Sequence, residues 1–558
     1  MPPAIPPLEL NRQELEKILE RALTAPLGQD DYQKLHAVLE TLAYMTQLLE
    51  NKNTTLQRLR QMVFGASTEK TGKILQKMAD QAVTSPSSPT TSEQSNGAPS
   101  PQPSSSPSAE SEPAPGHGRN GAQAYAGAEK VKVGHATLKS GDRCPKCEKG
   151  KVYAMATPGV LVRLVGQAPV AATVYELEKL RCNLCGEVFT AEPPARAGPD
   201  KYDATAASMI ALLKYGSGLP FHRLQGLQGN LETPLPASTQ WEIMARTTPG
   251  LRPAYQELIH QAAQGEVLYN DDTTMKILAL MGKDRRRAES EPMAVAEEDS
   301  ERTGIFTSGI VSTRAGQKIA LFFTGRKHAG ENLADVLAQR AQELPTPIQM
   351  CDGLERNLPK EIQTIVGNCL LHGRRKFVDV VTKFPDECRY LLETLREVYK
   401  HDAFCRQQEM SAQERLAHHQ THSRPLMEKL EKWFDEQFAE RKVEPNSGLG
   451  QAINYMQKRW DRLTLFLRQV GAPLDSNMVE RILKRAILHR KNSYFYKTEN
   501  GAHVGDLFMT LIHTCQLHGV NAFDYLTQLQ KHAEEVAAHP PDWMPWNYRD
   551  NLAQTTEL

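Results

Sequence analysis

The sequence predicts a multidomain α/β protein whose largest domain is built around a mixed five-stranded sheet with helices. Short apolar runs rich in β-branched and aromatic residues, the usual pattern of strands, begin at residues 266, 304, 317, 348 and 365. The first three runs follow one another directly, whereas a helical pattern, AGENLADVLAQRAQEL, separates the third from the fourth. At about 150 residues per domain, a chain of 558 residues has room for several domains.

Bulk composition excludes some classes of protein and leaves others open. Lys plus Arg and Asp plus Glu both number 66, so a surface that binds nucleic acid must be a local concentration of basic residues. No apolar run reaches the roughly 18 residues of a membrane-spanning helix, and the N-terminus lacks the pattern of a secretory signal. The nine cysteines include two C-x-x-C pairs, which favour a metal site in a reducing compartment over disulfides. We therefore expect a protein with no membrane partner.

Residues 1–80 are expected to be helical and to form a coiled coil. Leucine or valine recurs every seven residues from Leu35 to Val63, and a second apolar row three positions later is interrupted only by Lys52. These heptads indicate self-association through a leucine zipper, with an amphipathic helix packed on its own domain as the alternative. Residues 81–128 are dominated by Ser, Pro, Gly, Ala and Gln and are expected to be a disordered linker, because they cannot bury enough apolar surface to fold.

Residues 129–195 contain two pairs of cysteines with the spacing of zinc ligands. Each C-x-x-C pair can supply two thiolates from one turn, and two such turns joined by a β-hairpin complete the tetrahedral set that Zn²⁺ prefers. Reduced structural thiols are the alternative. Because cysteine would fill all four positions, the predicted zinc is structural rather than catalytic. The predicted ligands are Cys144, Cys147, Cys182 and Cys185.

Residues 196–260 show helical patterns. A turn at Pro236, with Ser238 or Thr239 as the N-cap, would start a helix that carries Trp241. Together with a helix near residues 220–227, this segment fits a helix-turn-helix that reads the major groove of DNA. Ordinary packing of two helices fits the same pattern.

The α/β domain is expected to span residues 261–500, with a helical insertion at about 385–470 and a further helical region at 501–558. Asp271 and Asp272 end its first apolar run, Asp352 ends the fourth, and Glu480 lies in a segment with helical periodicity. Carboxylates at the ends of two strands and on one helix can hold two Mg²⁺ ions, which prefer oxygen ligands and promote phosphoryl displacement. Surface acids at strand ends are the alternative.

Basic residues are concentrated beside these acids. One group follows the fifth apolar run, and another surrounds Glu480. A DNA backbone that approaches two metal ions requires such a surface, while each charge taken alone also fits a solvated helix face. The predicted phosphate-binding residues are Arg374, Arg375, Lys376, Arg481, Arg490 and Lys491.

These motifs together resemble the bacterial insertion sequence 66 family of DDE transposases, and the resemblance runs nearly from end to end. Residues 64–70 are similar to that family's F-G-x-x-S-E-K motif, and residues 372–377 are similar to its H-A-R-R-K-F signature. Other similar segments are KYGSGLPFHRLQ, N-D-D-T at 270–273, C-D-G at 351–353, D-S-N-M-V-E-R at 475–481, R-K-N at 490–492 and M-P-W-N at 544–547.

The resemblance implies a ribonuclease-H-like catalytic core in which Asp271, Asp352 and Glu480 hold Mg²⁺, or Mn²⁺, with His372 either near this site or in a structural position. It implies metal-dependent cleavage at transposon ends, at the terminal repeats, followed by strand transfer into target DNA. It also implies a bacterial, cytoplasmic, nucleoid-associated protein that forms homo-oligomers through its coiled coil, and it leaves room for accessory proteins from the same element.

Departures from the family's motifs leave questions open. Asp272 stands where the family has glutamate, so the first catalytic carboxylate is either Asp271 or Asp272, and alignment through Thr273 favours Asp271. Residues 282–303 form a charged insertion between the first two apolar runs. The alternative functions are a catalytically inactive, transposase-derived DNA-binding protein, a scaffold built on the coiled coil with no affinity for DNA, and a general ribonuclease.

Overall fold

The computed structural model describes residues 28–29, 137–153, 167–181, 188–281 and 302–556, and every structural statement below concerns these residues. The predicted linker and, apart from residues 28–29, the predicted coiled coil lie outside them, as do Cys182 and Cys185. None of the helices in the described part of the chain combines the length and the apolar character that a membrane span requires.

The described residues divide into two compact units. The first unit contains Arg374–Glu409 and Thr421–Ile453. The second contains the described residues between 137 and 373, Met410–Gln420 and the described residues from Asn454 onward, and both sheets of the described residues belong to it.

Helices α10 (Pro385–Gln407) and α12 (Arg424–Ala439) pack together in the first unit. Each has a proline in its first turn, where the missing N–H costs no intrahelical hydrogen bond. Trp433 of α12 packs against Tyr390 of α10 with ring centroids 5.0 Å apart. Aromatic and apolar residues on the facing sides of the two helices therefore hold this pair together.

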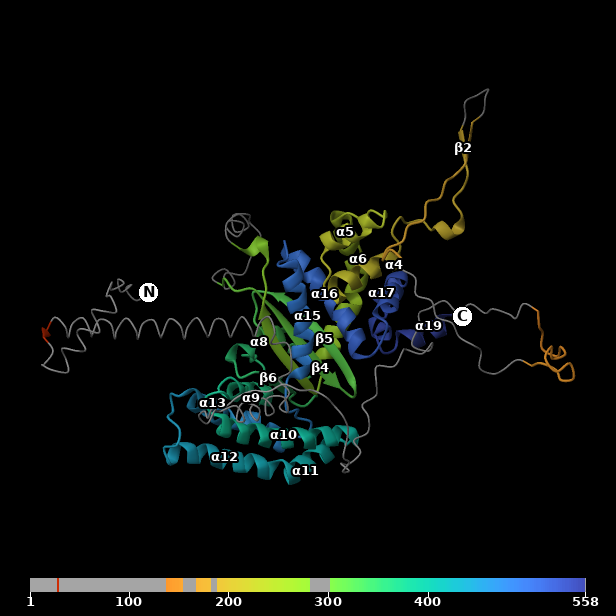
Figure 1. Cartoon of the computed structure of the whole chain (residues 1–558). Helices are drawn as coiled ribbons and strands as arrows, with labels where there is room; N and C mark the ends of the chain where they lie inside the picture. The colour runs from red at the N-terminus through yellow and green to blue at the C-terminus, as the bar shows by residue number, and fades with distance from the viewer. Residues whose placement is uncertain (1–27, 30–136, 154–166, 182–187, 282–301, 557–558) are drawn as a thin grey trace. The chain divides into compact units, whose positions relative to one another are not determined.

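The second unit is built on a mixed five-stranded sheet, which confirms the predicted α/β architecture (Figure 1). The strand order is β5-β4-β3-β6-β7. Strands β3, β4 and β5 form an antiparallel meander, whereas β6 and β7 run parallel to β3. The strands are β3 (Val267–Thr274), β4 (Phe306–Arg314), β5 (Gln317–Gly325), β6 (Ile348–Cys351) and β7 (Ile365–Asn368).

Besides this sheet, the described residues form a small antiparallel hairpin and a series of helices. The hairpin pairs β1 (Lys179–Arg181) with β2 (Val188–Thr190). The further helices are α4 (Ala204–Ala211), α5 (Phe221–Asn230), α6 (Ala237–Ala263), α8 (Ala329–Leu337), α9 (Leu370–Val378), α11 (Ala412–His422), α13 (Gly448–Gln457), α14 (Trp460–Leu463), α15 (Asn477–Ser493), α16 (Glu499–Leu517), α17 (Ala522–Lys531), α18 (Ala533–Ala538) and α19 (Tyr548–Thr556).

Helix α6 starts earlier than the sequence predicts. Its N-cap is Pro236, which has an extended backbone and makes no side-chain cap, so the predicted N-cap at Ser238 or Thr239 is wrong. Both residues lie inside the helix instead, because the fixed φ of proline already directs the chain into the first turn. The helix continues for 27 residues and packs against α16 and α18. Recognition of DNA by α5 and α6 stays a prediction.

Helices α8 and α15 pack on opposite faces of the central strands. Neighbouring residues of a strand point to opposite faces, as Ser308 and Gly309 do on β4. Asn332 of α8 donates from Nδ2 to Ser308 Oγ at 2.9 Å. A Cβ atom on Gly309 would instead meet the side chain of Leu483 on α15 at 3.0 Å. The sheet therefore has an α8 face and an α15 face.

In the described part of the chain, the outer edge of β5 is covered by α16 rather than by another strand. Side chains of α16, and of His518 directly after it, accept hydrogen bonds from this edge. These side chains recur every four residues. Four helical residues rise by about 6 Å, which nearly matches the roughly 6.6 Å between alternate residues of a strand. The main-chain N–H groups of alternate β5 residues are thereby satisfied, and the edge is closed to other strands. The pairs are Thr324 with Asp506 (2.7 Å), Phe322 with Thr510 (3.1 Å), Ala320 with Thr514 (3.1 Å) and Lys318 with His518 (3.2 Å).

Asp506 is the fully buried ionisable member of this series. Burial raises its pKa from the ordinary 3.8 to about 7, and the hydrogen bonds from the N–H and hydroxyl groups of Thr324 offset only part of that effect. Because the pKa is higher in the folded state, the unfolded chain releases this proton first as the pH rises. The contribution of Asp506 to stability therefore declines between the two pKa values and is constant above the higher one.

We predict that Asp506→Asn stabilises the protein at neutral and alkaline pH. An amide can accept from the Thr324 N–H and donate to the Thr324 hydroxyl, as the protonated carboxyl can, but it never ionises. The free energy of unfolding should increase by on the order of 2–4 kcal/mol above pH 7 and hardly change near pH 4. Thermal and urea unfolding between about pH 4 and pH 8 would measure this difference. The matched control Asp542→Asn, at an exposed position, should change neither value; a pH-independent effect of Asp506→Asn would contradict the prediction.

Candidate functional site

Asp271 and Asp272 occupy different faces of β3. In the β3–β4 register Asp271 lies opposite Gly309, and Asp272 lies opposite Ser308. Residues that face one another across two strands share a face of the sheet. Asp271 therefore lies on the α15 face, and Asp272 lies on the α8 face.

Asp272 is already engaged by two basic side chains. Its side chain is 1% exposed, with one carboxylate oxygen 2.8 Å from His328 Nδ1 and the other 3.1 Å from the guanidinium of Arg356. His328 is the N-cap of α8, and Arg356 lies in the segment that follows β6. This pairing connects β3 to two neighbouring elements, which is a structural task.

Asp271 and Asp352 share a single amide group. Asn357 donates from Nδ2 to Asp352 Oδ1 at 2.6 Å and to Asp271 Oδ1 at 3.3 Å. Both hydrogen bonds share the Nδ2 atom of Asn357, so the distance between Asp352 Oδ1 and Asp271 Oδ1 cannot exceed the sum of their two lengths. Asp271 lies on β3 and Asp352 directly follows β6, its parallel neighbour. Tyr269 of β3 pairs with Met350 of β6, so the two acids, each two residues further on, lie at the same level of neighbouring strands.

Asn357 is itself held by a buried amide network that the sequence patterns did not predict. It is fully buried, and its main-chain carbonyl accepts from Asn270 Nδ2 and from Gln349 Nε2, both at 2.7 Å. Gln349 also donates to Asn270 Oδ1 at 2.9 Å. Buried amides with several satisfied hydrogen bonds fix their neighbours in place. The network therefore positions the side chain that bridges the two aspartates.

The proximity of the two acids changes the chemistry of Asp271. Burial and the negative charge of Asp352 raise the pKa of Asp271 from 3.8 to about 7, although hydrogen bonds from Asp272 N–H and Asn357 oppose the rise. Two carboxylates held this close favour either a shared proton or a bound cation. Their oxygen atoms are the donors that Mg²⁺ and Mn²⁺ prefer.

Glu480 lies in the first turn of α15, on the same face of the sheet as Asp271. Three residues further along the helix, Leu483 lies directly over Gly309, the cross-strand partner of Asp271. The absence of a side chain at Gly309 lets α15 approach the sheet at this point. Glu480 and Asp271 therefore share a face of the sheet. The described ion pair of Glu480 is with His372 at 3.9 Å, and the described group with the spacing of metal ligands joins Glu480 to Cys369 and His372 rather than to the aspartates.

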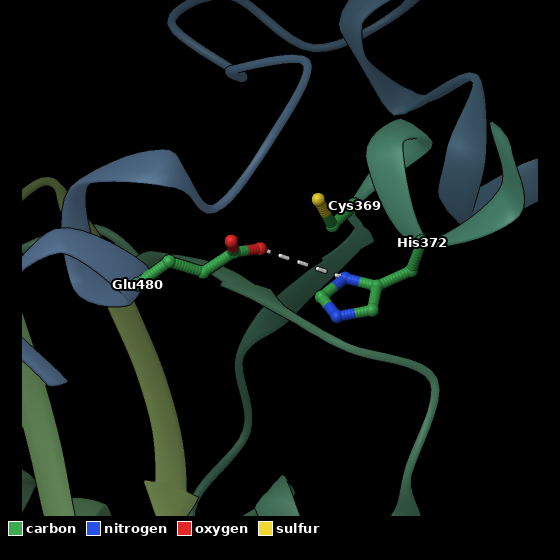
Figure 2. Close-up of side chains that lie close together, drawn as sticks. All are labelled: Cys369, His372 and Glu480. Carbon is green, nitrogen blue, oxygen red and sulfur yellow. Dashed lines mark ion pairs between the residues drawn. The ribbon is translucent and has the colours of Figure 1, made fainter. Parts of the chain in front are cut away.

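Cys369, His372 and Glu480 form a compact group (Figure 2). Their ligand atoms all lie within 4.8 Å of one another. Figure 2 shows the imidazole of His372 and the carboxylate of Glu480 directed toward each other, with the thiol of Cys369 near both. Cys369 directly follows β7, and its N–H donates to the carbonyl of Cys351 at 3.1 Å, next to Asp352.

Helix α15 presents a row of basic residues to solvent. Its buried residues, such as Val479 and Leu483, occupy one side, and the exposed basic residues occupy the other. Two of the basic residues noted in the sequence are not part of this exposed row. Arg490 donates to Thr273 and Thr274 at the end of β3, while His489 is buried, and burial lowers its pKa to about 3. The exposed residues of the row are Arg481, Lys484, Arg485 and Lys491.

The second predicted basic group divides by burial. Arg374 is 5% exposed, which argues against its predicted contact with phosphate. Arg375 and Lys376 are exposed on α9, and their predicted role stays open to test. The sequence pattern could not separate the three, because burial depends on how α9 packs.

Arg459 is a basic residue near the acids that sequence reasoning missed. Its guanidinium donates to the carbonyl of Gly353 at 3.2 Å, immediately after Asp352, and lies over the ring of Tyr455 at 4.3 Å. The stacking orients the guanidinium, and Arg side chains bind phosphate in a bidentate manner. Arg459 lies more than 100 residues after Asp352, so no local motif signals it.

The first cysteine pair forms a tight turn. Cys144 N–H donates to the Gly150 carbonyl at 2.8 Å, and Glu148 N–H donates to the Cys144 carbonyl at the same distance. Main-chain N–H groups of Gly150 and Lys149 lower the pKa of the exposed Cys147 thiol. A lowered pKa favours the thiolate, which is the form that binds metal. The second pair lies outside the described residues.

Comparison with known proteins assigns the family. Residues 201–504, more than half of the chain and all of the five-stranded sheet, match the Transposase IS66 family. The chain belongs to this family. The match contains Asp271, Asp352 and Glu480, and it confirms the resemblance that the sequence motifs carry.

Three relatives of this IS66-family chain come from Sinorhizobium fredii. The uncharacterized protein y4hP is 24% identical over 68% of this chain and 69% of its own length. The uncharacterized protein y4jD is 26% identical over 67% of this chain and 72% of its own length. The uncharacterized protein y4qI is 26% identical over 61% of each chain. These long matches are consistent with one shared architecture.

We predict that Gly309→Val displaces α15 from the sheet of this transposase-family chain. The new side chain would overlap Leu483 and Ile482, because even a Cβ lies only 3.0–3.3 Å from them. Overpacking of this kind costs about 1–3 kcal/mol. Urea unfolding would measure the loss of stability, and amide hydrogen exchange in α15 should become faster than in α16.

The matched control is Gly325→Val at the end of β5, where no atom lies within 4 Å of the added Cβ. Its stability should change by no more than about 0.5 kcal/mol. Equal destabilisation by the two variants would contradict the prediction, because the loss of stability would then come from replacing a strand glycine and not from contact with α15.

Proposed function

We propose that this chain is an active DNA transposase that cuts at the ends of its element and joins the freed ends to target DNA. The observation that carries the proposal is the pairing of Asp271 and Asp352 through Asn357, on the face of the sheet that α15 covers with Glu480. Two acids from parallel strands and one from a helix match the requirement of two-metal phosphoryl transfer. Engagement of Asp272 by His328 and Arg356 supports Asp271 as the first carboxylate.

The strand order supports a ribonuclease-H-like core. Asp271 lies on the central strand β3, which has an antiparallel meander on one side and two parallel strands on the other. Glu480 follows only after the helices between residues 385 and 463. This arrangement agrees with the catalytic core and the helical insertion at about 385–470 that the family resemblance implies.

Asp271, Asp352 and Glu480 are the residues proposed to hold Mg²⁺ or Mn²⁺. Their donors are all oxygen atoms, and burial together with the charge of Asp352 raises the pKa of Asp271, an effect that a bound cation would offset. When bound, such ions neutralise charge on the phosphate and activate the attacking oxygen. The network of Asn270, Gln349 and Asn357 keeps the two aspartates in place for this role.

The proposed reaction exchanges phosphodiester bonds. In cleavage, a water oxygen bonds to phosphorus at the element end, and the 3′ oxygen leaves as a hydroxyl. In joining, that 3′ oxygen bonds to a phosphorus of target DNA, and the target's own 3′ oxygen leaves. One phosphodiester replaces another in the joining step, so no external energy source is required. The task of the chain is to position both DNA strands and the acids.

DNA binding is proposed to use the basic residues nearest the acids. Arg459 lies beside Asp352, and Arg481 directly follows Glu480. The exposed row on α15 extends from there through Lys484 and Arg485 to Lys491. Phosphate contacts of this kind position DNA without reading its sequence. Arg375 and Lys376 remain in the proposal. Arg374 and Arg490 are less favoured, since Arg374 is buried and Arg490 donates to Thr273 and Thr274.

The other segments keep the roles expected from the sequence. We assign residues 129–195 to a structural zinc module, supported by the Cys144–Cys147 turn and the β1–β2 hairpin. Residues 1–80 are proposed to form the homo-oligomeric coiled coil, with residues 81–128 as linker. The zinc module and residues 196–260 are proposed to recognise the transposon ends. Residues 501–558 include the helix that covers β5.

An inactive, transposase-derived DNA-binding protein is the second candidate function. The basic row on α15 would serve it equally well. The close pairing of Asp271 and Asp352 speaks against it, because pure DNA binding gains nothing from two repelling carboxylates held together. Loss of metal-dependent cleavage with retained DNA binding would identify this candidate.

We predict that Asp352→Asn abolishes strand cleavage and joining on DNA that carries the element's ends. Removing one carboxylate weakens the hold on the divalent ions, and the rate should fall by at least about 100-fold. The assay compares both proteins with Mg²⁺ and with EDTA. Asp335→Asn, an exposed residue on α8, is the matched control and should cleave normally. Cleavage by Asp352→Asn at the wild-type rate would rule out the proposed site.

We also predict that the double variant Lys484→Ala with Arg485→Ala weakens DNA binding and its dependence on salt. Each lost phosphate contact should lower the slope of log affinity against log salt concentration by about 0.9. Binding titrations at several salt concentrations would measure this slope. Lys531→Ala, at an exposed position at the end of α17, should leave it unchanged. An unaltered slope in the double variant would place the DNA on another surface.

A further inference from the structure

The group of Cys369, His372 and Glu480 offers three different donor atoms, one sulfur, one nitrogen and one oxygen (Figure 2). Two of its members are held by the same turn, because His372 N–H donates to the Cys369 carbonyl at 3.2 Å. The third comes from the first turn of α15. The cluster is therefore fixed by two elements that also carry the proposed catalytic region.

The spacing of the donors suits a small tetrahedral ion. Bonds of about 2.0–2.3 Å to zinc place its ligands roughly 3.3–3.6 Å apart. The described separation of His372 Nδ1 and Glu480 Oε1 is 3.9 Å, and no pair in the group exceeds 4.8 Å. Modest side-chain rotation closes this difference.

One donor atom is buried and has no hydrogen bond. His372 Nδ1 has no hydrogen-bond partner among the described residues, since 3.9 Å to Glu480 is too long. The thiol of Cys369, by contrast, is oriented, because it accepts from Ser476 N–H at 3.4 Å. An unsatisfied buried nitrogen is costly unless a ligand pairs with it. The side chains of His372 and Glu480 are 24% and 22% exposed, which leaves an ion a path to the site.

The donor set also selects between metals. Mg²⁺ prefers oxygen ligands and takes neither thiolate nor imidazole readily. Zn²⁺ binds sulfur, nitrogen and oxygen, and three protein ligands leave its fourth position to water. The cluster therefore favours zinc over the ions expected at the aspartates.

We propose that Cys369, His372 and Glu480 bind Zn²⁺, and that zinc bound there inhibits the enzyme by withdrawing Glu480 from the catalytic ions. The inhibitory part rests on the proposed function, in which Glu480 is the third catalytic carboxylate. The binding part stands on the cluster alone. This site is separate from the structural zinc predicted at Cys144 and Cys147.

The binding part is tested with Co²⁺ as a spectroscopic probe, followed by displacement with Zn²⁺, on the full-length chain. Cys369→Ser should lose one ion per chain and part of the thiolate-to-cobalt absorption. Cys351→Ser is the matched control, a neighbouring buried cysteine outside the cluster, and should bind like the wild type. Wild type, Cys369→Ser and Cys351→Ser all contain the predicted zinc module, so ions bound there do not contribute to the difference in metal content between them. Identical metal content in Cys369→Ser and wild type would overturn the proposal; if Cys369→Ser does not fold, His372→Gln gives the same comparison.

The inhibitory part is tested by titrating Zn²⁺ into the DNA cleavage assay at constant Mg²⁺. Wild type should lose activity and regain it when Mg²⁺ is raised. Cys369→Ser should keep Mg²⁺-dependent cleavage and require at least about tenfold more zinc for the same inhibition. Equal sensitivity of the two proteins would refute inhibition through this site. Absence of cleavage by every protein would count against the proposed function, while the cobalt measurement would still decide whether the cluster binds metal.

Discussion

Two carboxylates that repel each other, those of Asp271 and Asp352, are kept side by side by the amide of Asn357. The repulsion is tolerated because the carbonyl of Asn357 is bound by two further amides in the interior of the sheet. The hydrogen bonds of this buried network offset the unfavourable proximity of the two carboxylates, as is usual at functional sites. The pair thereby fixes the loop after β6, which carries Asn357, to the central strand β3.

The alternation of side chains along β3 gives two adjacent aspartates separate tasks. Asp272 connects the sheet to α8 and to Arg356, whereas Asp271 faces the side on which α15 brings Glu480. Gly309 completes the arrangement from the neighbouring strand, since its missing side chain sets how closely α15 approaches. The two aspartates are therefore not interchangeable, even though both are acidic and adjacent.

The five strands of the sheet can be predicted from the sequence, because apolar runs are local signals. The sequence left Asp271 and Asp272 as alternatives, since only the pairing with β4 and the partners of Asp272 distinguish them. Asn357 and Arg459 were missed because their roles arise from contacts between distant segments. Sequence alone groups Arg374 with its exposed neighbours although it is buried. In Pro236-Ala-Ser-Thr, it also cannot separate a helix that starts at the proline from one that starts at a hydroxyl side chain. Sequence patterns identify helices and strands, whereas tertiary packing determines which side chains are exposed.

The cover of β5 by α16 has a consequence for how the protein is made. The acceptors Asp506, Thr510, Thr514 and His518 all lie beyond residue 504, where the family match ends, and they follow their β5 partners by 182–200 residues. During synthesis, the strand edge therefore emerges from the ribosome long before its cover does. A gene interrupted after residue 504 would yield a chain that has all three proposed catalytic acids but an uncovered β5 edge. Such a product is expected to aggregate rather than to retain reduced activity.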